Sequence, residues 1–214
     1  MQRKRQLWKI LIVSGYLIGA TGLIITYPAP NYYFLSWLFA LITFIILIAA
    51  HTPWTHKSAA SLALIGIAGW TIEAIGVNTG LIFGHYQYGN SLGFKIAETP
   101  LMMAINWIFM IYLVSMVLKD RITNTFHFLT IGGLTMVFYD LLLEPFAIRF
   151  DLWNWQDKNP PLQNFIGWFL VSIPMLYVCK KTLQQSKNEL ADTILLTQIF
   201  FYGLVNATVA LFMV

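Results

Sequence analysis

The strongest constraint on the fold is a series of apolar segments, each about as long as a membrane-spanning helix. A helix needs about 20 mainly apolar residues to cross a bilayer. Turn-forming or polar residues such as Pro28, Pro30, Pro53 and Asp120 separate the segments. We therefore expect one all-α integral membrane domain over residues 1–214, a polytopic bundle of about seven transmembrane helices. The expected spans are 7–27, 33–51, 58–77, 100–118, 125–147, 163–179 and 191–213.

Composition excludes an ordinary soluble domain. Hydrophobic residues make up 58% of the chain and charged residues only 10%, whereas soluble domains carry roughly 25% charged residues. The first apolar run, 7–27, is too long for a signal peptide and has no small-residue cleavage site after it. We therefore interpret it as the first span.

The basic residues predict the orientation. With the N-terminus in the cytoplasm, ten of the 13 Lys and Arg residues lie on the cytoplasmic side, which follows the positive-inside bias. The remaining three are Lys95, Arg149 and Lys158. The chain is thus expected to lie N-in and C-out in the cell membrane. The two long connections, 78–99 and 148–162, then fall on the outer side, and we expect them to fold back as a lid.

Three carboxylates interrupt the apolar spans. Glu73 lies near the end of its span, and Asp140 and Glu144 lie near the end of theirs, so all three are expected in the outer half of the membrane. Such residues are costly in a bilayer, usually face a bundle interior, and often mark function. Asp140 and Glu144 share one helix face. The alternative is that the acids reach the nearby interface or pair with Arg149.

Aromatic and amide side chains accompany the acids. Tyr86 with Tyr88, and Trp153 with Trp155, point the same way if these loops are extended. Their rings are suited to stabilising a cation or to forming an aromatic belt at the interface. Buried amides orient a water molecule or join helices. The order of acid helix, aromatic loop and Asn/Trp helix occurs twice, which is a weak sign of an internal repeat. The candidate substrate contacts are Tyr86, Tyr88, Trp107, Trp153, Trp155, Asn106, Asn164, Trp168 and His85.

Several kinds of site lack their parts in this sequence. The last span has no lysine for a retinal Schiff base, and the four histidines do not form the clusters of membrane di-iron oxygenases. A single cysteine, Cys179, excludes an internal disulfide. The net charge of +4 comes from short clusters beside the spans, which indicates topology rather than nucleic-acid binding. We expect neither a metal nor a cofactor.

The acidic and aromatic blocks resemble a known family. One block runs from Trp70 to Trp107 with Glu73, and the other is Asp140-Leu-Leu-Leu-Glu144-Pro-Phe-Ala, followed by Trp153-x-Trp155 and Asn164-x-x-Gly-Trp168. Together they resemble membrane carotenoid biosynthesis proteins that act as carotenoid 1,2-hydratases. The resemblance covers about residues 70–170. It implies addition of water across the terminal C1=C2 double bond of an acyclic carotenoid end.

The catalytic hypothesis combines this resemblance with the chemistry of the acids. Asp140 is expected to protonate the double bond, and Glu73 and Glu144 to tune it and hold the attacking water. The substrate would arrive from the lipid phase. Two alternatives remain: a membrane prenyltransferase, because Asp140-x-x-x-Glu144 has the spacing of a magnesium-diphosphate motif, and a proton-coupled transporter or lipid carrier. The sequence leaves the oligomeric state open.

Overall fold

The computed structural model describes residues 2–27 and 33–212, and within them it contains seven helices and four short strands. Each helix overlaps one of the expected spans, with ends that differ by a few residues. The helices are α1 Gln2–Thr26, α2 Phe34–Ala49, α3 His56–Thr79, α4 Met102–Leu118, α5 Thr125–Arg149, α6 Leu162–Thr182 and α7 Ala191–Phe212. The strands are β1 Tyr86–Tyr88, β2 Lys95–Ile96, β3 Thr99–Pro100 and β4 Trp153–Trp155.

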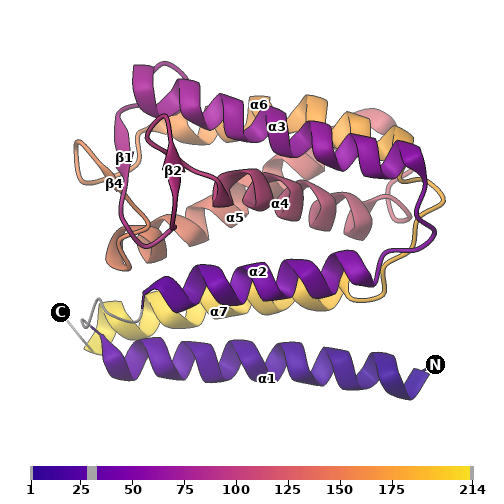
Figure 1. The fold of residues 1–214 in the computed structure, drawn as a ribbon, viewed down its shortest axis with the longest axis horizontal. Coiled ribbons are helices and arrows are strands. Elements are labelled where there is room, and N and C mark those ends of the chain that lie inside the picture. Colours follow the sequence, from indigo (N-terminus) through magenta and orange to yellow (C-terminus); the bar gives the residue numbers. More distant parts are fainter. Residues whose placement is uncertain (1, 28–32, 213–214) are drawn as a thin grey trace.

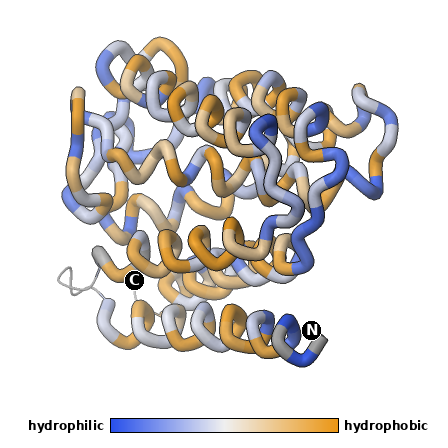
Figure 2. The backbone as a smooth tube through the Cα atoms, turned by 45° about the vertical axis from the view of Figure 1, so that its right-hand side comes forward, coloured by the Kyte–Doolittle hydropathy of each residue, from blue (hydrophilic) through white to orange (hydrophobic). Residues whose placement is uncertain are grey.

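Five of the helices are long and apolar enough to cross a membrane, and the protein is an integral membrane protein by this criterion. These are α1, α3, α5, α6 and α7. The other two, α2 and α4, are shorter apolar helices. Seven crossings and the N-in, C-out orientation therefore stay predictions. Apolar residues dominate the helices, and hydrophilic ones gather at the N-terminal end and in the connections (Figure 2).

The helices form two parts that lie against each other (Figure 1). The α3–α4 and α5–α6 pairs make a four-helix bundle. Helices α1, α2 and α7 form a second layer along one side of the bundle, the outer layer of the fold. Helix α7 packs on α1 within the layer and on both α4 and α5 in the bundle. The core of the bundle is α4, where every side chain from Met110 to Val114 is fully buried.

Glycine allows the closest helix approach beside the carboxylates. A Cβ on Gly69 in α3 would lie 2.4 Å from the Trp107 ring of α4. Because glycine has no side chain, α3 and α4 approach closely enough for the Trp107 indole to lie across α3. Gly167 of α6 likewise leaves room for Phe83, whose ring would lie 2.8 Å from a Cβ on that glycine.

The two long connections pair with each other instead of forming separate loops. Strands β1 and β4 are antiparallel, with Tyr86 opposite Trp155 and Tyr88 opposite Trp153. The N–H of Gly89 donates to the Leu152 carbonyl at 2.9 Å and extends this two-stranded ribbon. The ribbon lies at one end of the bundle (Figure 1). This pairing agrees with the expectation that both connections fold back over the acids.

The opposite end of the molecule joins the two parts of the fold. Thr52 and Lys187 exchange backbone hydrogen bonds, so the α2–α3 and α6–α7 connections lie side by side. Asn188 adds two side-chain bonds there, donating to the Leu47 carbonyl at 2.7 Å and to the Tyr112 hydroxyl at 2.9 Å. The outer layer is therefore tied to the bundle at the end away from the ribbon.

Candidate active site

Glu73 of α3 is a buried carboxylate that accepts from three neutral donors. The hydroxyls of Tyr86 and Tyr88 both donate to Oε2 at 2.6 Å, and the indole N–H of Trp107 donates to Oε1 at 2.9 Å. Only 3% of Glu73 is exposed. Hydrogen bonds to an ionised acceptor are among the stronger ones in proteins, at about 1.5–3 kcal/mol each. The three donors therefore offset part of the cost of burying this carboxylate.

The two tyrosines remain donors throughout the ordinary pH range. Burial raises the pKa of the Tyr86 hydroxyl, and the neighbouring Glu73 carboxylate raises it further. The pKa of Tyr88 lies well above its usual value for the same two reasons. Because both phenols keep their protons, neither is suited to act as a base at neutral pH. Their role is to hold Glu73.

Glu144 of α5 receives an equivalent pair of donors from β4. The indole N–H groups of Trp153 and Trp155 donate to Oε2 at 3.1 and 2.7 Å. Alternate residues of a strand point to the same side, which explains why each strand supplies two rings to one carboxylate. The outward-facing Gln87 and Asn154 lie opposite each other between them.

Asn164 of α6 connects the second and third acids. Its amide nitrogen donates to Asp140 Oδ2 at 2.6 Å and to Glu144 Oε1 at 3.3 Å. Asp140 is fully buried, and its Oδ1 makes no hydrogen bond to any described residue. Arg149, the expected alternative partner of the acids, donates instead to Asn206 at 3.3 Å. Among the described residues, no ion pair neutralises the three carboxylates.

A water-sized cavity lies between the two glutamates. Its volume is about 20 Å³, close to the space that one water molecule needs. Aromatic rings make up most of its wall, and Asp140 does not line it. The lining residues are Glu73, Phe83, Tyr86, Tyr88, Met103, Glu144, Trp153, Trp155, Asn164 and Trp168.

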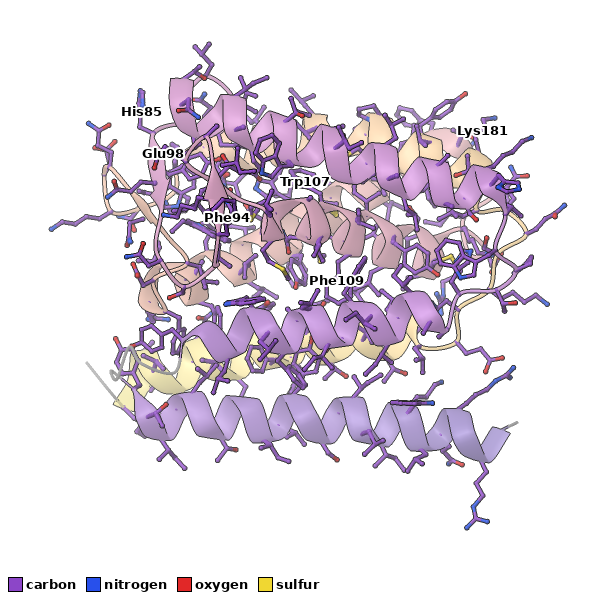
Figure 3. The ribbon with its side chains drawn as sticks, in the orientation of Figure 1. His85, Phe94, Glu98, Trp107, Phe109 and Lys181 are labelled. Carbon is purple, nitrogen blue, oxygen red and sulfur yellow. The ribbon has the colours of Figure 1, made fainter. Side chains whose placement is uncertain are left out.

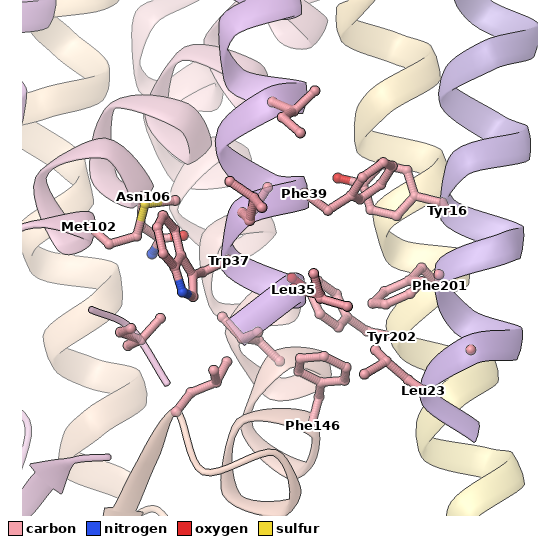
Figure 4. A pocket seen from close by; sticks show the side chains of 18 of the residues that line it. Tyr16, Leu23, Leu35, Trp37, Phe39, Met102, Asn106, Phe146, Phe201 and Tyr202 are labelled. Atoms are coloured by element: carbon pink, nitrogen blue, oxygen red, sulfur yellow. The ribbon is translucent and has the colours of Figure 1, made fainter. Parts of the chain in front are cut away.

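A larger apolar cavity of about 540 Å³ adjoins the first, on the side of the outer layer. Figure 4 shows its wall, where Tyr16 of α1, Phe39 of α2 and Phe201 of α7 contribute rings. Met103 and Trp153 line both cavities. These two residues therefore form the boundary between the larger apolar cavity and the carboxylates.

Most of the predicted site residues meet in one place. The three acids, both tyrosines, Asn164 and four of the tryptophans gather around the water-sized cavity or bond to a residue that lines it. Trp107 and Trp168 stack with ring centres 4.8 Å apart. Asn106 lies elsewhere and lines the larger cavity (Figure 4). His85 is exposed at the ribbon end of the molecule and lines neither cavity (Figure 3).

Two further residues belong to the site. Met103 forms part of the boundary wall, and Phe83 packs beside Tyr86 with ring centres 6.3 Å apart. Met103 gave no signal in the sequence because it is one apolar residue in an apolar span. Phe83 lies in the aromatic block after Glu73, and this position in the sequence could have indicated that it belongs to the site. The larger cavity was also missed, since α1, α2 and α7 are all uniformly apolar.

The residues around the two cavities include few groups that could bind an anion or a metal ion. Among the described residues that line either cavity, none is Lys or Arg. Within residues 2–27 and 33–212, no three His, Cys, Asp or Glu side chains are grouped so that they would hold a metal ion together. The polar groups at the carboxylates are neutral donors from Tyr, Trp and Asn.

Comparison with known proteins places the chain in a family. The family described as carotenoid biosynthesis protein matches residues 32–214. The chain belongs to the carotenoid biosynthesis protein family. This family membership and the apolar helices indicate an integral membrane protein, whereas the cell membrane and the outer position of the site stay predictions. The site described above lies within the matched region, whereas α1 precedes it.

A curated relative carries a more specific name. The chain is 30% identical over 167 residues to the bisanhydrobacterioruberin hydratase of Haloarcula japonica, an alignment that covers 72% of this chain and 55% of the relative. The chain thus spans about half the length of that relative. No solved structure is significantly similar to the chain. The family and this relative together support a carotenoid-modifying role.

Proposed function

We propose that the protein is a carotenoid 1,2-hydratase, which adds water across the terminal C1=C2 double bond of an acyclic carotenoid end. The observation that carries the proposal is the pair of adjoining cavities. One has room for about a single water between two glutamates, and the other is larger, apolar and partly lined by aromatic rings. A hydratase of a polyene needs both kinds of space, with the reacting carbon atoms at their boundary.

Glu144 acts as the acid in this proposal. Its two indole donors both bond Oε2, while among the described residues Oε1 receives only the long 3.3 Å contact from Asn164. Asp140 lies one helical turn away and bonds the same amide. Two neighbouring carboxyl groups in a buried site disfavour double ionisation, so one proton stays on this pair. That proton is transferred to C2 of the substrate.

Glu73 acts as the base. Proton transfer to C2 leaves a tertiary cation at C1, which the rings of Tyr88, Trp153 and Trp168 stabilise by cation–π attraction. The water oxygen between the glutamates forms the new C–O bond at C1, and its proton passes to Glu73. One water is consumed, and the product is a tertiary alcohol. When the product leaves, water carries the proton from Glu73 back to Glu144.

This assignment changes the role given to Asp140. The sequence suggested Asp140 as the direct donor, but its side chain bonds Asn164 and does not line the water-sized cavity. We propose that Asp140 positions Asn164 and keeps a proton on the pair. A prenyltransferase is the less favoured function, because a diphosphate needs cationic partners and none of the described lining residues is cationic.

The test is expression of the full chain in a lycopene-producing cell, followed by pigment mass analysis. We expect the wild type to add the mass of one water per hydrated end. Glu144→Gln and Glu73→Gln should each lower the rate about 10²- to 10⁴-fold, the usual contribution of general acid or base catalysis. Asp140→Asn should retain more activity than either.

Glu98→Gln is the matched control, since Glu98 is an exposed glutamate in the same connection as β1. It should retain wild-type activity. Unchanged hydration in both Glu144→Gln and Glu73→Gln would refute the assignment of roles. A product heavier by a prenyl group, or no change in substrate mass with the wild type, would refute the hydratase itself.

A further inference from the structure

The larger cavity runs from exposed residues of α1 and α2 to the boundary of the water-sized cavity. At its outer end the lining residues are apolar and exposed: Ile18 is 73% exposed and Leu35 is 44% exposed. At its inner end Met103 and Trp153 are only 3% and 6% exposed. The cavity is therefore open at one end and closed at the other by the residues that flank the carboxylates.

The open end lies between α1 and α2. Near the middle of α1, Gly15 lies against Phe39 of α2, whose ring would lie 2.7 Å from a Cβ on that glycine. Tyr16 packs edge-on against the same ring, with centres 4.8 Å apart. One and two turns further along α1, a Cβ on Gly19 or Gly22 would meet no heavy atom of the described residues within 4 Å. Among the described residues, α1 and α2 thus touch at Gly15 and Phe39, and no side chain covers Gly19 or Gly22.

The residues at this opening are exposed and apolar, which suits contact with the hydrocarbon of a bilayer. Ile18 and Leu35 line this opening, and each is an exposed apolar side chain on a helix of the outer layer. An acyclic carotenoid is about as long as a bilayer is thick, whereas this cavity of about 540 Å³ ends inside the protein at Met103 and Trp153. Part of the polyene must stay outside while one end reaches the carboxylates.

We infer that the gap between α1 and α2 is a lateral entrance through which an acyclic polyene passes from the lipid phase, end first, until its terminus lies against Met103 and Trp153. This inference rests on the proposed function. Gly19 and Gly22 keep the entrance open because they place no side chain in it. Gly15 and Phe39 close the entrance on the side nearer the N-terminus of α1.

The lining favours a polyene over the acyl chain of a phospholipid. Flat rings from Tyr16, Trp37, Phe146 and Phe201 line the path and suit a rigid conjugated chain. The polar lining groups, such as Asn106, carry no charge. A phosphate headgroup would have no cationic partner among the described residues of the rim. An acyl chain in the cavity is the competing outcome of the test.

The test is retention of lycopene by the full-length protein, where retained lycopene includes any hydrated product that the protein has formed from it. Wild type, Gly19→Trp and Gly22→Phe are purified in mild detergent from lycopene-producing cells, and bound pigment per protein is measured by absorbance and mass spectrometry. Two variants are used so that the result does not depend on the folding of one. Each should retain about tenfold less lycopene than the wild type, with an unchanged thermal unfolding midpoint.

Gly203→Trp is the matched control. Gly203 is also a helical glycine whose added Cβ would meet no described heavy atom nearby, but it does not line the cavity. It should retain wild-type lycopene. Equal lycopene in the wild type and in both entrance variants would overturn the entrance, as would purified wild type that holds phospholipid in place of lycopene.

A further variant separates this inference from the proposed reaction. Glu144→Gln should lose hydration but keep bound lycopene, because Glu144 lines the water-sized cavity and not the larger one. If the wild type binds lycopene without hydrating it and Gly19→Trp loses the pigment, the entrance stands and the reaction fails. If hydration proceeds and Gly19→Trp has no effect on rate or pigment, the reaction stands and the entrance fails.

Discussion

Asn164 is the residue on which the arrangement of the acids depends most. One amide nitrogen serves both Asp140 and Glu144, and the shorter bond, 2.6 Å, goes to Asp140. All three side chains are buried. Removing a donor from buried acceptors leaves them unsatisfied, which costs about 1–3 kcal/mol for each group. Asn164 therefore contributes to stability as well as to the geometry of Glu144.

Asn164→Ala should lower both stability and activity. We expect a loss of about 1–3 kcal/mol, seen as a lower thermal unfolding midpoint in detergent, together with a reduced rate of lycopene hydration. Asn106→Ala is the control, because Asn106 lines the larger cavity and makes no bond to the acids. It should leave the unfolding midpoint near that of the wild type. Similar stability losses in both variants would contradict this role of Asn164.

The difference between these two asparagines was not predictable from sequence. Each precedes a tryptophan in an apolar span, and each was equally able to orient water or join helices. The structure separates them because Asn106 and Trp107 are neighbours on α4 and so point about 100° apart around the helix. Trp107 faces Glu73, and Asn106 consequently faces the outer layer.

At the scale of elements, the β1–β4 ribbon determines which rings reach which acid. Its register places Tyr86 opposite Trp155 and Tyr88 opposite Trp153. A shift of either strand by one residue would turn its two rings to the opposite face. Gly89 extends the ribbon at a point of close contact, because a Cβ there would lie 2.1 Å from the Asp151 carbonyl oxygen.

Gly89→Ala should therefore disrupt the site without touching a carboxylate. The added methyl group cannot be accommodated against a backbone oxygen, so β1 and β4 must move apart. A displacement near 1 Å at catalytic groups costs about a hundredfold in rate, and we expect a loss of that order in lycopene hydration. Gly203→Ala, a methyl group added in open space, should have no effect. Wild-type activity in Gly89→Ala would show that the ribbon does not position the rings.

The elements themselves were largely predictable, and their partners were not. Apolar length placed all seven helices, since a polar break such as Pro53 or Asp120 separates each from the next. The i, i+2 spacing of the aromatic pairs predicted that each pair shares a side. Nothing in the sequence indicated that β1 pairs with β4, because strand pairing between distant segments depends on tertiary contacts rather than local pattern.

For the whole molecule, the orientation in the membrane is the main untested prediction. The positive-inside bias predicts the N-terminus in the cytoplasm and the C-terminus outside. A C-terminal alkaline phosphatase fusion should accordingly be active, because that enzyme works only outside the cytoplasm. The same reporter inserted after Lys187, in the α6–α7 connection, should be inactive. An inactive C-terminal fusion with an active fusion at Lys187 would reverse the orientation and place the site on the cytoplasmic side.

The molecule also contains two similar halves around the site. In the α3–β1–α4 half, Glu73 receives two rings from its strand and one from its second helix. In the α5–β4–α6 half, Glu144 receives two rings from its strand and an amide from its second helix. Trp107 and Trp168, one from each half, stack where the halves meet. The weak repeat suggested by the sequence thus corresponds to a repeated arrangement of donors.

The pairing of β1 with β4 also sets an order of assembly during synthesis. The ribosome completes β1 well before β4, and the chain between Tyr88 and Trp153 includes both α4 and α5. Until the second half is inserted, β1 lacks its partner strand and Glu144 lacks its two indoles. The newly made first half therefore carries Glu73 but lacks Glu144, the acid of the proposed reaction. That reaction thus requires the last helices of the bundle to be in place.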